Sequence, residues 1–178
     1  MSGAARRTGM RSLLVVCALA ALGGRALADD ELKVGDRLTE LDTAVDASGK
    51  AFHLKAYKGH WVMLTFGASW CGPCAKELPA WDKLAPDWKG KVTFIAVDLD
   101  SKVEDGKRFH DKARLKNLLR VYLSPESAVA AKYGSDHMPT TVLADPSGVI
   151  RYVRGGFEKG DVDGEVKQMQ AQLQKLVR

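Results

Sequence analysis

Two cysteines lie three positions apart in the stretch "GASWCGPCAKELPA" (residues 67–80), directly after an apolar run. Thiols at this spacing can form a structural disulfide, hold a metal ion or exchange electrons with another disulfide. A disulfide that closes so short a loop removes little entropy from the unfolded chain. We therefore expect Cys71 and Cys74 to be a reactive dithiol rather than a stabilising crosslink.

The rest of the chain offers little to a metal ion. A structural zinc site needs four ligands, usually from a second cysteine pair or a Cys/His pair. The histidines are scattered singly, at positions 53, 60, 110 and 137. We therefore expect no metal site and no cofactor, and a soft copper(I) site made by the two thiolates stays open as an alternative.

The N-terminal segment has the composition of a secretory signal peptide. Arg6, Arg7 and Arg11 precede the apolar run of residues 12–24, and the small residues "ALA" precede Asp29. The run is shorter than the roughly 18 apolar residues that a membrane anchor needs. We expect a signal peptide over residues 1–28, cleaved after Ala28, and a periplasmic or otherwise exported domain over residues 29–178; a retained anchor is the alternative.

Removal of this segment changes the charge of the chain. The full sequence has 27 basic and 22 acidic residues, and residues 1–28 hold four arginines, no lysine and no acid. The exported part would then carry 23 basic against 22 acidic residues, so we expect no nucleic-acid partner. Cys17 leaves with the segment, and Cys71 and Cys74 become the only cysteines.

The remaining sequence alternates between strand and helix patterns. Residues 60–66 ("HWVMLTF") and 91–100 ("KVTFIAVDLD") are apolar runs typical of strands buried on both faces. A helix from about residue 71 should be kinked at Pro79 and disturbed or ended at Pro86. The other predicted elements are a short strand in 51–57, a charged helix in 103–118, a strand in 119–124, a helix in 125–134, a hairpin of 140–144 and 149–153, and a helix from 161. This order predicts one α/β domain.

The junction of strand and helix explains the cysteine motif. Free N–H groups and the positive dipole end of a helix favour a thiolate at Cys71, which lowers the pKa of that thiol. Cys74 lies about one turn further on, where it can attack a mixed disulfide formed at Cys71. Pro73 suits a first helical turn, and Gly72 lets a partner backbone pass close.

These residues resemble a known family. "WCGPC", followed about seventy residues later by "MPTT" between a helix and a hairpin, resembles a thioredoxin-fold oxidoreductase. "ASWCGPCAKELP" is similar to the TlpA/ResA-like branch of exported thiol-disulfide reductases. The resemblance covers residues 35–176. It implies a thioredoxin-like fold with a central mixed β-sheet flanked by helices, an N-terminal hairpin and a helix–strand insertion between residues 100 and 124.

The resemblance also implies roles in the reaction. Cys71 would be the exposed attacking thiol and Cys74 the buried resolving thiol. Glu77 would be a partly buried carboxylate that moves protons at the cysteines, because burial raises a carboxyl pKa towards neutrality. The alternative for Glu77 is an early-helix acid favoured by the dipole. Thr65 stands where thioredoxins proper have a buried aspartate, which argues against that narrower class.

Further residues would bind the client protein. Pro139 would be a cis-proline opposite the dithiol, and Met138 would offer backbone hydrogen bonds. Trp70, with Gly72 and Pro73, would shape the docking surface. An ordinary trans-proline and a tryptophan in the core are the alternatives for Pro139 and Trp70.

We therefore predict an exported monomeric reductase of client-protein disulfides, re-reduced by a membrane electron donor. Clients of the family include apocytochrome c and respiratory copper-site proteins. Alternatives are a thiol peroxidase, which usually has a threonine where Ala68 stands, a copper(I) metallochaperone, and a dithiol oxidase with a higher redox potential.

Overall fold

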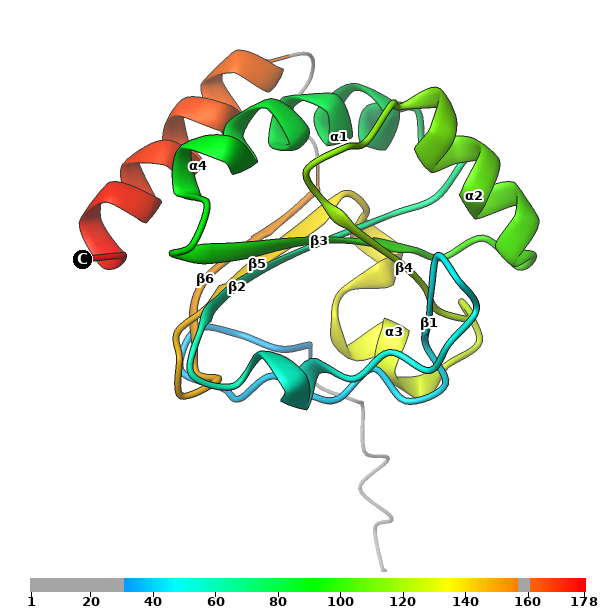
Figure 1. Ribbon diagram of the computed structural model, residues 1–178, viewed down its shortest axis with the longest axis horizontal. Helices are drawn as coiled ribbons and strands as arrows, with labels where there is room; N and C mark the ends of the chain where they lie inside the picture. The colour runs from blue at the N-terminus through cyan, green and yellow to red at the C-terminus, as the bar shows by residue number, and fades with distance from the viewer. Residues whose placement is uncertain (1–30, 157–160) are drawn as a thin grey trace, which may run out of the picture.

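The computed structural model of the protein describes residues 31–156 and 161–178 (Figure 1). The predicted signal peptide and its cleavage after Ala28 lie outside these residues. Within the two described ranges, none of the helices combines the length and the apolar character that a membrane crossing requires.

Six strands form one mixed sheet in the order β1-β4-β3-β2-β5-β6. Their bounds are β1 Val45–Asp46, β2 Trp61–Gly67, β3 Val92–Asp98, β4 Leu119–Tyr122, β5 Thr140–Ala144 and β6 Ile150–Gly155. The central strand β2 runs parallel to β3 on one side and antiparallel to β5 on the other. The predicted apolar runs thus form the two middle strands of the sheet.

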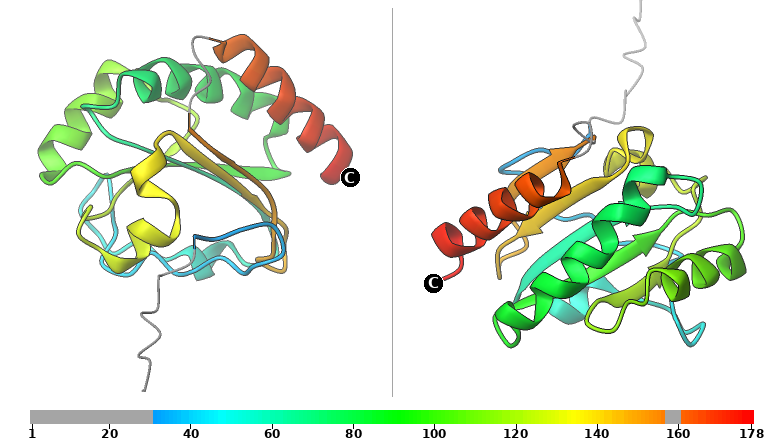
Figure 2. Two further views of the ribbon diagram at one scale, coloured as in Figure 1. Left: turned by 180° about the vertical axis from the view of Figure 1, so that it is seen from behind. Right: turned by 90° about the horizontal axis from the view of Figure 1, so that it is seen from above.

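Helices cover both faces of the sheet. The α-helices are α1 Gly72–Leu84, α2 Val103–Lys112, α3 Ala128–Lys132 and α4 Val162–Leu176, and the 3-10 helices are η1 Leu54–Tyr57, η2 Ala85–Trp88 and η3 Ser135–His137. Figure 1 shows α1, α2 and α4 on one face, with α3 and the N-terminal segment on the other. In Figure 2, α1 lies between α4 and α2 and runs roughly along the direction of the strands. The predicted thioredoxin-like α/β fold is confirmed.

Alternation along β2 divides the core into two layers. Leu64 and Phe66 pack on the side of the sheet that α3 covers. Met63, the residue before Leu64, points to the opposite face and packs on the side of α1. Met169 and Leu173 of α4 are fully buried in this second layer, four residues apart on one side of the helix. The two layers clamp β2 in place and therefore fix the loop that follows its last residue.

The predicted strand in residues 51–57 is wrong. Ala51 makes only an isolated bridge with Val45, and Leu54–Tyr57 form the 3-10 helix η1. The carboxylate of Glu40 accepts hydrogen bonds from the N–H groups of Leu54, at 2.6 Å, and Lys55, at 3.0 Å. These bonds stabilise a helical turn, whereas the alternation of apolar and polar residues had indicated an extended strand. The predicted N-terminal hairpin is therefore reduced to the bridge between Val45 and Ala51.

Two helix ends also differ from the prediction. α3 begins at Ala128, where the Ser127 hydroxyl caps it by accepting a hydrogen bond from Val129 N–H at 3.3 Å, so Pro125 precedes the helix. α2 ends at Lys112 instead of continuing to residue 118, because the Asp82 carboxylate takes up backbone N–H groups of the following loop.

The two prolines after the cysteine motif act differently. α1 runs through Pro79 to Leu84 without ending there, whereas Pro86 lies in the first turn of the 3-10 helix η2 that follows. The helix that begins at the cysteines is therefore long enough to run along the sheet and pack against α4.

Candidate active site

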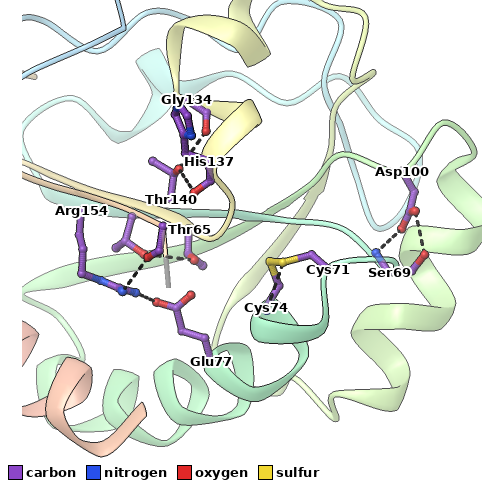
Figure 3. The surroundings of a disulfide bond; sticks show 12 residues. Thr65, Ser69, Cys71, Cys74, Glu77, Asp100, Gly134, His137, Thr140 and Arg154 are labelled. Carbon is purple, nitrogen blue, oxygen red and sulfur yellow. Dashed lines mark hydrogen bonds and ion pairs between the residues drawn. A yellow bond between two sulfur atoms is a disulfide. The ribbon is translucent and has the colours of Figure 1, made fainter. Parts of the chain in front are cut away.

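The two cysteines are joined by a disulfide at the start of α1 (Figure 3). Cys71 is the N-cap residue of the helix, and its Sγ accepts a hydrogen bond from Cys74 N–H at 3.2 Å. This N–H and the positive end of the helix dipole point at the atom that carries the charge when the disulfide is reduced. The local geometry therefore stabilises a thiolate at Cys71.

Both cysteines are shielded from solvent, to different degrees. Cys71 is 6% exposed and Cys74 is 1% exposed, so Cys71 is the more accessible of the two but less open than the sequence led us to expect. Gly67, at the end of β2, closes over Cys74. A Cβ at this glycine would lie 3.0 Å from Cys74 Cβ and 3.2 Å from its Sγ, so a larger residue would require Cys74 to move by a few tenths of an ångström.

The residues beside the disulfide form its outer surface. Trp70 is 68% exposed, so it is not a core residue. Gly72 is exposed and Pro73 is half-buried. These three residues are available to a partner that approaches Cys71.

The loop before β5 carries the predicted proline. The Met138–Pro139 peptide bond is cis, which excludes the trans alternative. Pro139 is buried and Met138 is half-buried against both core layers. Thr140 pairs with Phe66 of β2. Pro139 therefore lies at the end of the paired strands, where Gly67 leads into the cysteine segment.

Glu77 lies on the buried side of α1, three residues after Cys74. It is 1% exposed and forms an ion pair with Arg154, which also pairs with Glu165 at 2.6 Å. Burial raises the pKa of Glu77 to about 7; Arg154 opposes this shift and Glu165 adds to it. Glu77 is therefore a buried carboxylate with a pKa near neutrality, and it lies beyond the first turn of α1, the turn in which the helix dipole favours an acid.

Arg154 reaches this position through the register of the sheet. It pairs with Thr141 on β5, which pairs with Thr65 on β2. Thr65, the residue at the place of the thioredoxin aspartate, accepts a hydrogen bond at 3.3 Å from the Thr141 hydroxyl. Sequence reasoning did not find Arg154 or Glu165, because neither lies near the motif along the chain.

A second buried carboxylate supports the loop before Cys71. Asp100 accepts hydrogen bonds from Ser69 N–H at 2.9 Å and from the Ser69 hydroxyl at 2.8 Å. Asp98 in turn accepts a bond from Asp100 N–H at 3.0 Å. Burial raises the pKa of Asp98 to about 7, and α2 lies on it so closely that a Cβ at Gly106 would be 2.0 Å from its Oδ1. The sequence indicated these carboxylates only by the two aspartates that end the apolar run of residues 91–100.

The histidines take no part in the site as it stands. His110 lies on the buried side of α2, and burial lowers its pKa to about 4, so it is neutral at physiological pH. His137 is exposed and lies 3.6 Å from Glu31. In residues 31–156 and 161–178, no three Cys, His, Asp or Glu side chains gather in a way that could hold a metal ion.

The chain is similar to proteins of a known family. The model of the AhpC/TSA family matches residues 34–153, more than half of the chain. The thiol-disulfide oxidoreductase ResA of Bacillus thuringiensis (strain Al Hakam) is 34% identical over 126 residues, which cover 70% of this chain and 72% of ResA.

Solved structures share the fold. A Chlorobium tepidum protein assigned as the thiol:disulfide interchange protein DsbE superposes with a TM-score of 0.67 at 28% identity, over 80% of this chain and 99% of that chain. A thiol:disulfide interchange protein from Bacteroides sp. gives 0.66 at 25% identity, over 82% and 91%. The fold and the disulfide define a thioredoxin-like thiol-disulfide oxidoreductase, and the chain belongs to the AhpC/TSA family.

Proposed function

We propose that this protein is an exported reductase of client-protein disulfides. The observation that carries the proposal is the Cys71 Sγ at the N-cap of α1, where Cys74 N–H donates to it. The thiolate is the form of a cysteine that attacks a disulfide, and this contact favours it at Cys71. Glycine and proline between the cysteines match reducing members of the thioredoxin fold, which supports this direction of electron flow.

The reaction proceeds by two exchanges. In the reduced protein, the Cys71 thiolate attacks one sulfur of the client disulfide, forms a mixed disulfide and expels the other client sulfur as a thiolate. Cys74 then attacks Cys71 Sγ, which releases the second client thiolate and leaves the Cys71–Cys74 disulfide seen in the structure. The client gains two electrons, and the protein loses them.

Glu77 serves the second exchange in this proposal. The Cys74 thiol, only 1% exposed, must lose its proton before it can attack. Glu77 lies three residues further along α1, and in Figure 3 the oxygen that does not face Arg154 lies on the side of the cysteines. Because its pKa is about 7, Glu77 can take up that proton and release it again at neutral pH.

The client is held beside the disulfide. Trp70, Gly72 and Pro73 form the surface around Cys71. Met138 lies two residues before Thr140, which pairs with Phe66 near the end of β2 that leads to Cys71. We propose that an extended client segment hydrogen-bonds to Met138 while its disulfide meets Cys71. The client classes of the TlpA/ResA-like branch, apocytochrome c and respiratory copper-site proteins, are the candidates.

Location and partners complete the proposal. Residues 1–28 would direct export and be removed after Ala28, as their charge and apolar pattern indicate. Exported compartments are oxidising, so a reductase there needs a supply of electrons, which we assign to a membrane donor. We propose that the protein works as a monomer.

Single-cysteine variants test the proposal. Cys74→Ser should trap a mixed disulfide between Cys71 and the client, because the resolving thiol is missing, whereas Cys71→Ser should lose insulin-disulfide reduction and trap nothing. Equal trapping by both variants would contradict the assigned roles. Turnover of hydrogen peroxide, or stoichiometric copper(I) binding with no disulfide reduction, would instead favour the peroxidase or the metallochaperone.

A further inference from the structure

Three charged side chains from three separate elements meet behind the disulfide. Glu77 comes from α1, Arg154 from β6 and Glu165 from α4. Their side chains are 1%, 13% and 7% exposed. Arg154 contacts Glu77 through Nη2 and Glu165 through Nη1, at 2.6 Å in the second case, and Nη1 also donates to Gly156 O at 3.2 Å. Figure 3 shows Arg154 reaching across the sheet to Glu77 on the helix that bears the cysteines.

Arg154 faces two carboxylates at once in a place with little water. Its positive charge favours the ionised form of Glu77, whereas burial and the second carboxylate favour the protonated form. Glu77 is the more buried acid, and burial raises its pKa to about 7.

Neutral side chains also face Glu77 from the elements around it. From β6, Tyr152 joins it as a neutral phenol whose pKa burial raises above its usual value. β2 and β5 present the hydroxyls of Thr65 and Thr141 on this row of the sheet. From α1 itself come Trp81 and the cysteines. The protonation of Glu77 therefore depends on Arg154, which favours the carboxylate, and on Glu165, which disfavours it.

We propose that Arg154 and Glu165 are positioning residues that act on the reaction through Glu77. Arg154 holds one oxygen of Glu77 in place and leaves the other to the side of Cys74. Glu165 competes for the same guanidinium and prevents Arg154 from fixing Glu77 permanently as a carboxylate. The pair thereby sets the pH range in which Glu77 exchanges a proton with the resolving cysteine. This inference rests on the proposed role of Glu77.

Titration of the Glu77 carboxyl carbon by NMR, in isotope-labelled protein, tests the proposal without an activity assay. Arg154→Met should raise the Glu77 midpoint by about one to three pH units, the range by which a neighbouring arginine shifts a carboxyl. Glu165→Gln should lower it, because the competing charge is gone while the side chain keeps its shape. Opposite shifts are not what two merely structural residues would give.

Two further variants serve as controls for the loss of the Arg154 charge. Arg151→Met removes an exposed arginine of the same strand, which pairs with Asp145, and should leave the Glu77 midpoint unchanged. Arg154→Lys keeps the positive charge and should hold the Glu77 midpoint close to the wild-type value. An unmoved midpoint in Arg154→Met, or shifts in the same direction for Arg154→Met and Glu165→Gln, would overturn the proposal.

Failure of this inference is distinguishable from failure of the proposed function. If the midpoints move as expected but Glu77→Gln reduces insulin normally, the coupling of the three residues stands and the role of Glu77 in the reaction is wrong, so Arg154 and Glu165 would not act on catalysis. If the role of Glu77 is right, the pH–rate profile should follow the midpoint, towards higher pH in Arg154→Met and lower pH in Glu165→Gln.

Discussion

Asp100 binds Ser69 twice, through the backbone N–H and through the hydroxyl, and so ties the end of β3 to the loop that leads into Cys71. The two residues are 31 positions apart in the sequence. Because Ser69 is followed by Trp70 and Cys71, this clamp fixes the start of α1 and the direction of the client-facing surface.

Asp100→Ala should loosen that loop. It leaves the Ser69 N–H without its acceptor, which should cost about 1–3 kcal/mol in the free energy of unfolding measured with urea. Ser69→Ala removes only the hydroxyl bond and is the matched control, with an expected cost of about 1 kcal/mol. Equal stability of both variants and the wild type would show that the clamp does not hold the loop.

Glu77→Gln should flatten the pH–rate profile of disulfide reduction near neutrality. Glutamine keeps the shape of the side chain but takes up no proton, so the step that activates Cys74 loses its acceptor. We expect a loss of up to about 10²-fold in insulin reduction at neutral pH, the lower range for a general base. Glu104→Gln makes the same change at an exposed position of α2 and should have no effect. A wild-type profile for Glu77→Gln would refute the role.

Asp98 should make the stability depend on pH. Its pKa rises from 3.8 in the unfolded chain to about 7 in the folded protein, so the native state binds more protons between these values. The free energy of unfolding that Asp98 contributes is therefore complete below about pH 4 and is lost as the pH rises through 7. His110 contributes the opposite slope between about pH 4 and 6.5, so only a comparison with a variant isolates Asp98.

Asp98→Asn is that comparison. Relative to the wild type, it should gain on the order of 1–3 kcal/mol in stability between about pH 5 and pH 8, because asparagine does not titrate. Urea unfolding at the two pH values measures the difference. A constant difference between variant and wild type would mean that Asp98 is already ionised throughout this range.

Trp70→Ala should separate client binding from stability. Trp70 is 68% exposed, so its loss should change the free energy of unfolding by less than about 0.5 kcal/mol, whereas the KM for a protein client should rise. The control is Trp81→Ala in the core, where a fully buried ring is lost and about 3–5 kcal/mol of stability should go with it. An unchanged KM in Trp70→Ala would remove this residue from the docking surface.

The sequence was most informative where the signal is local. A buried strand followed by "WCGPC" predicted the helix start at Cys71, since capping and the apolar pattern depend on a few neighbouring residues. The proline before β5 was predicted from the motif around Met138 and is cis in the structure. The hairpin of β5 and β6 followed from its turn residues and was confirmed within two residues.

What the sequence did not show depends on register and on packing between elements. Arg154 meets Glu77 because β6 pairs with β5 in one particular register and α1 lies above them. Glu165 adds to the cluster only because α4 packs against α1. The turn at Leu54 escaped prediction for the same reason, since the Glu40 carboxylate that holds it lies 14 residues earlier.

The reduction potential of the Cys71/Cys74 pair tests the central claim most directly. Equilibration of the protein without residues 1–28 against glutathione or dithiothreitol gives this value. We expect a potential near or below that of thioredoxin, about −270 mV, as a thiol pair that donates electrons to clients requires. A value close to that of the strongly oxidising periplasmic enzymes, about −120 mV, would reverse the direction of electron flow and contradict the proposed function.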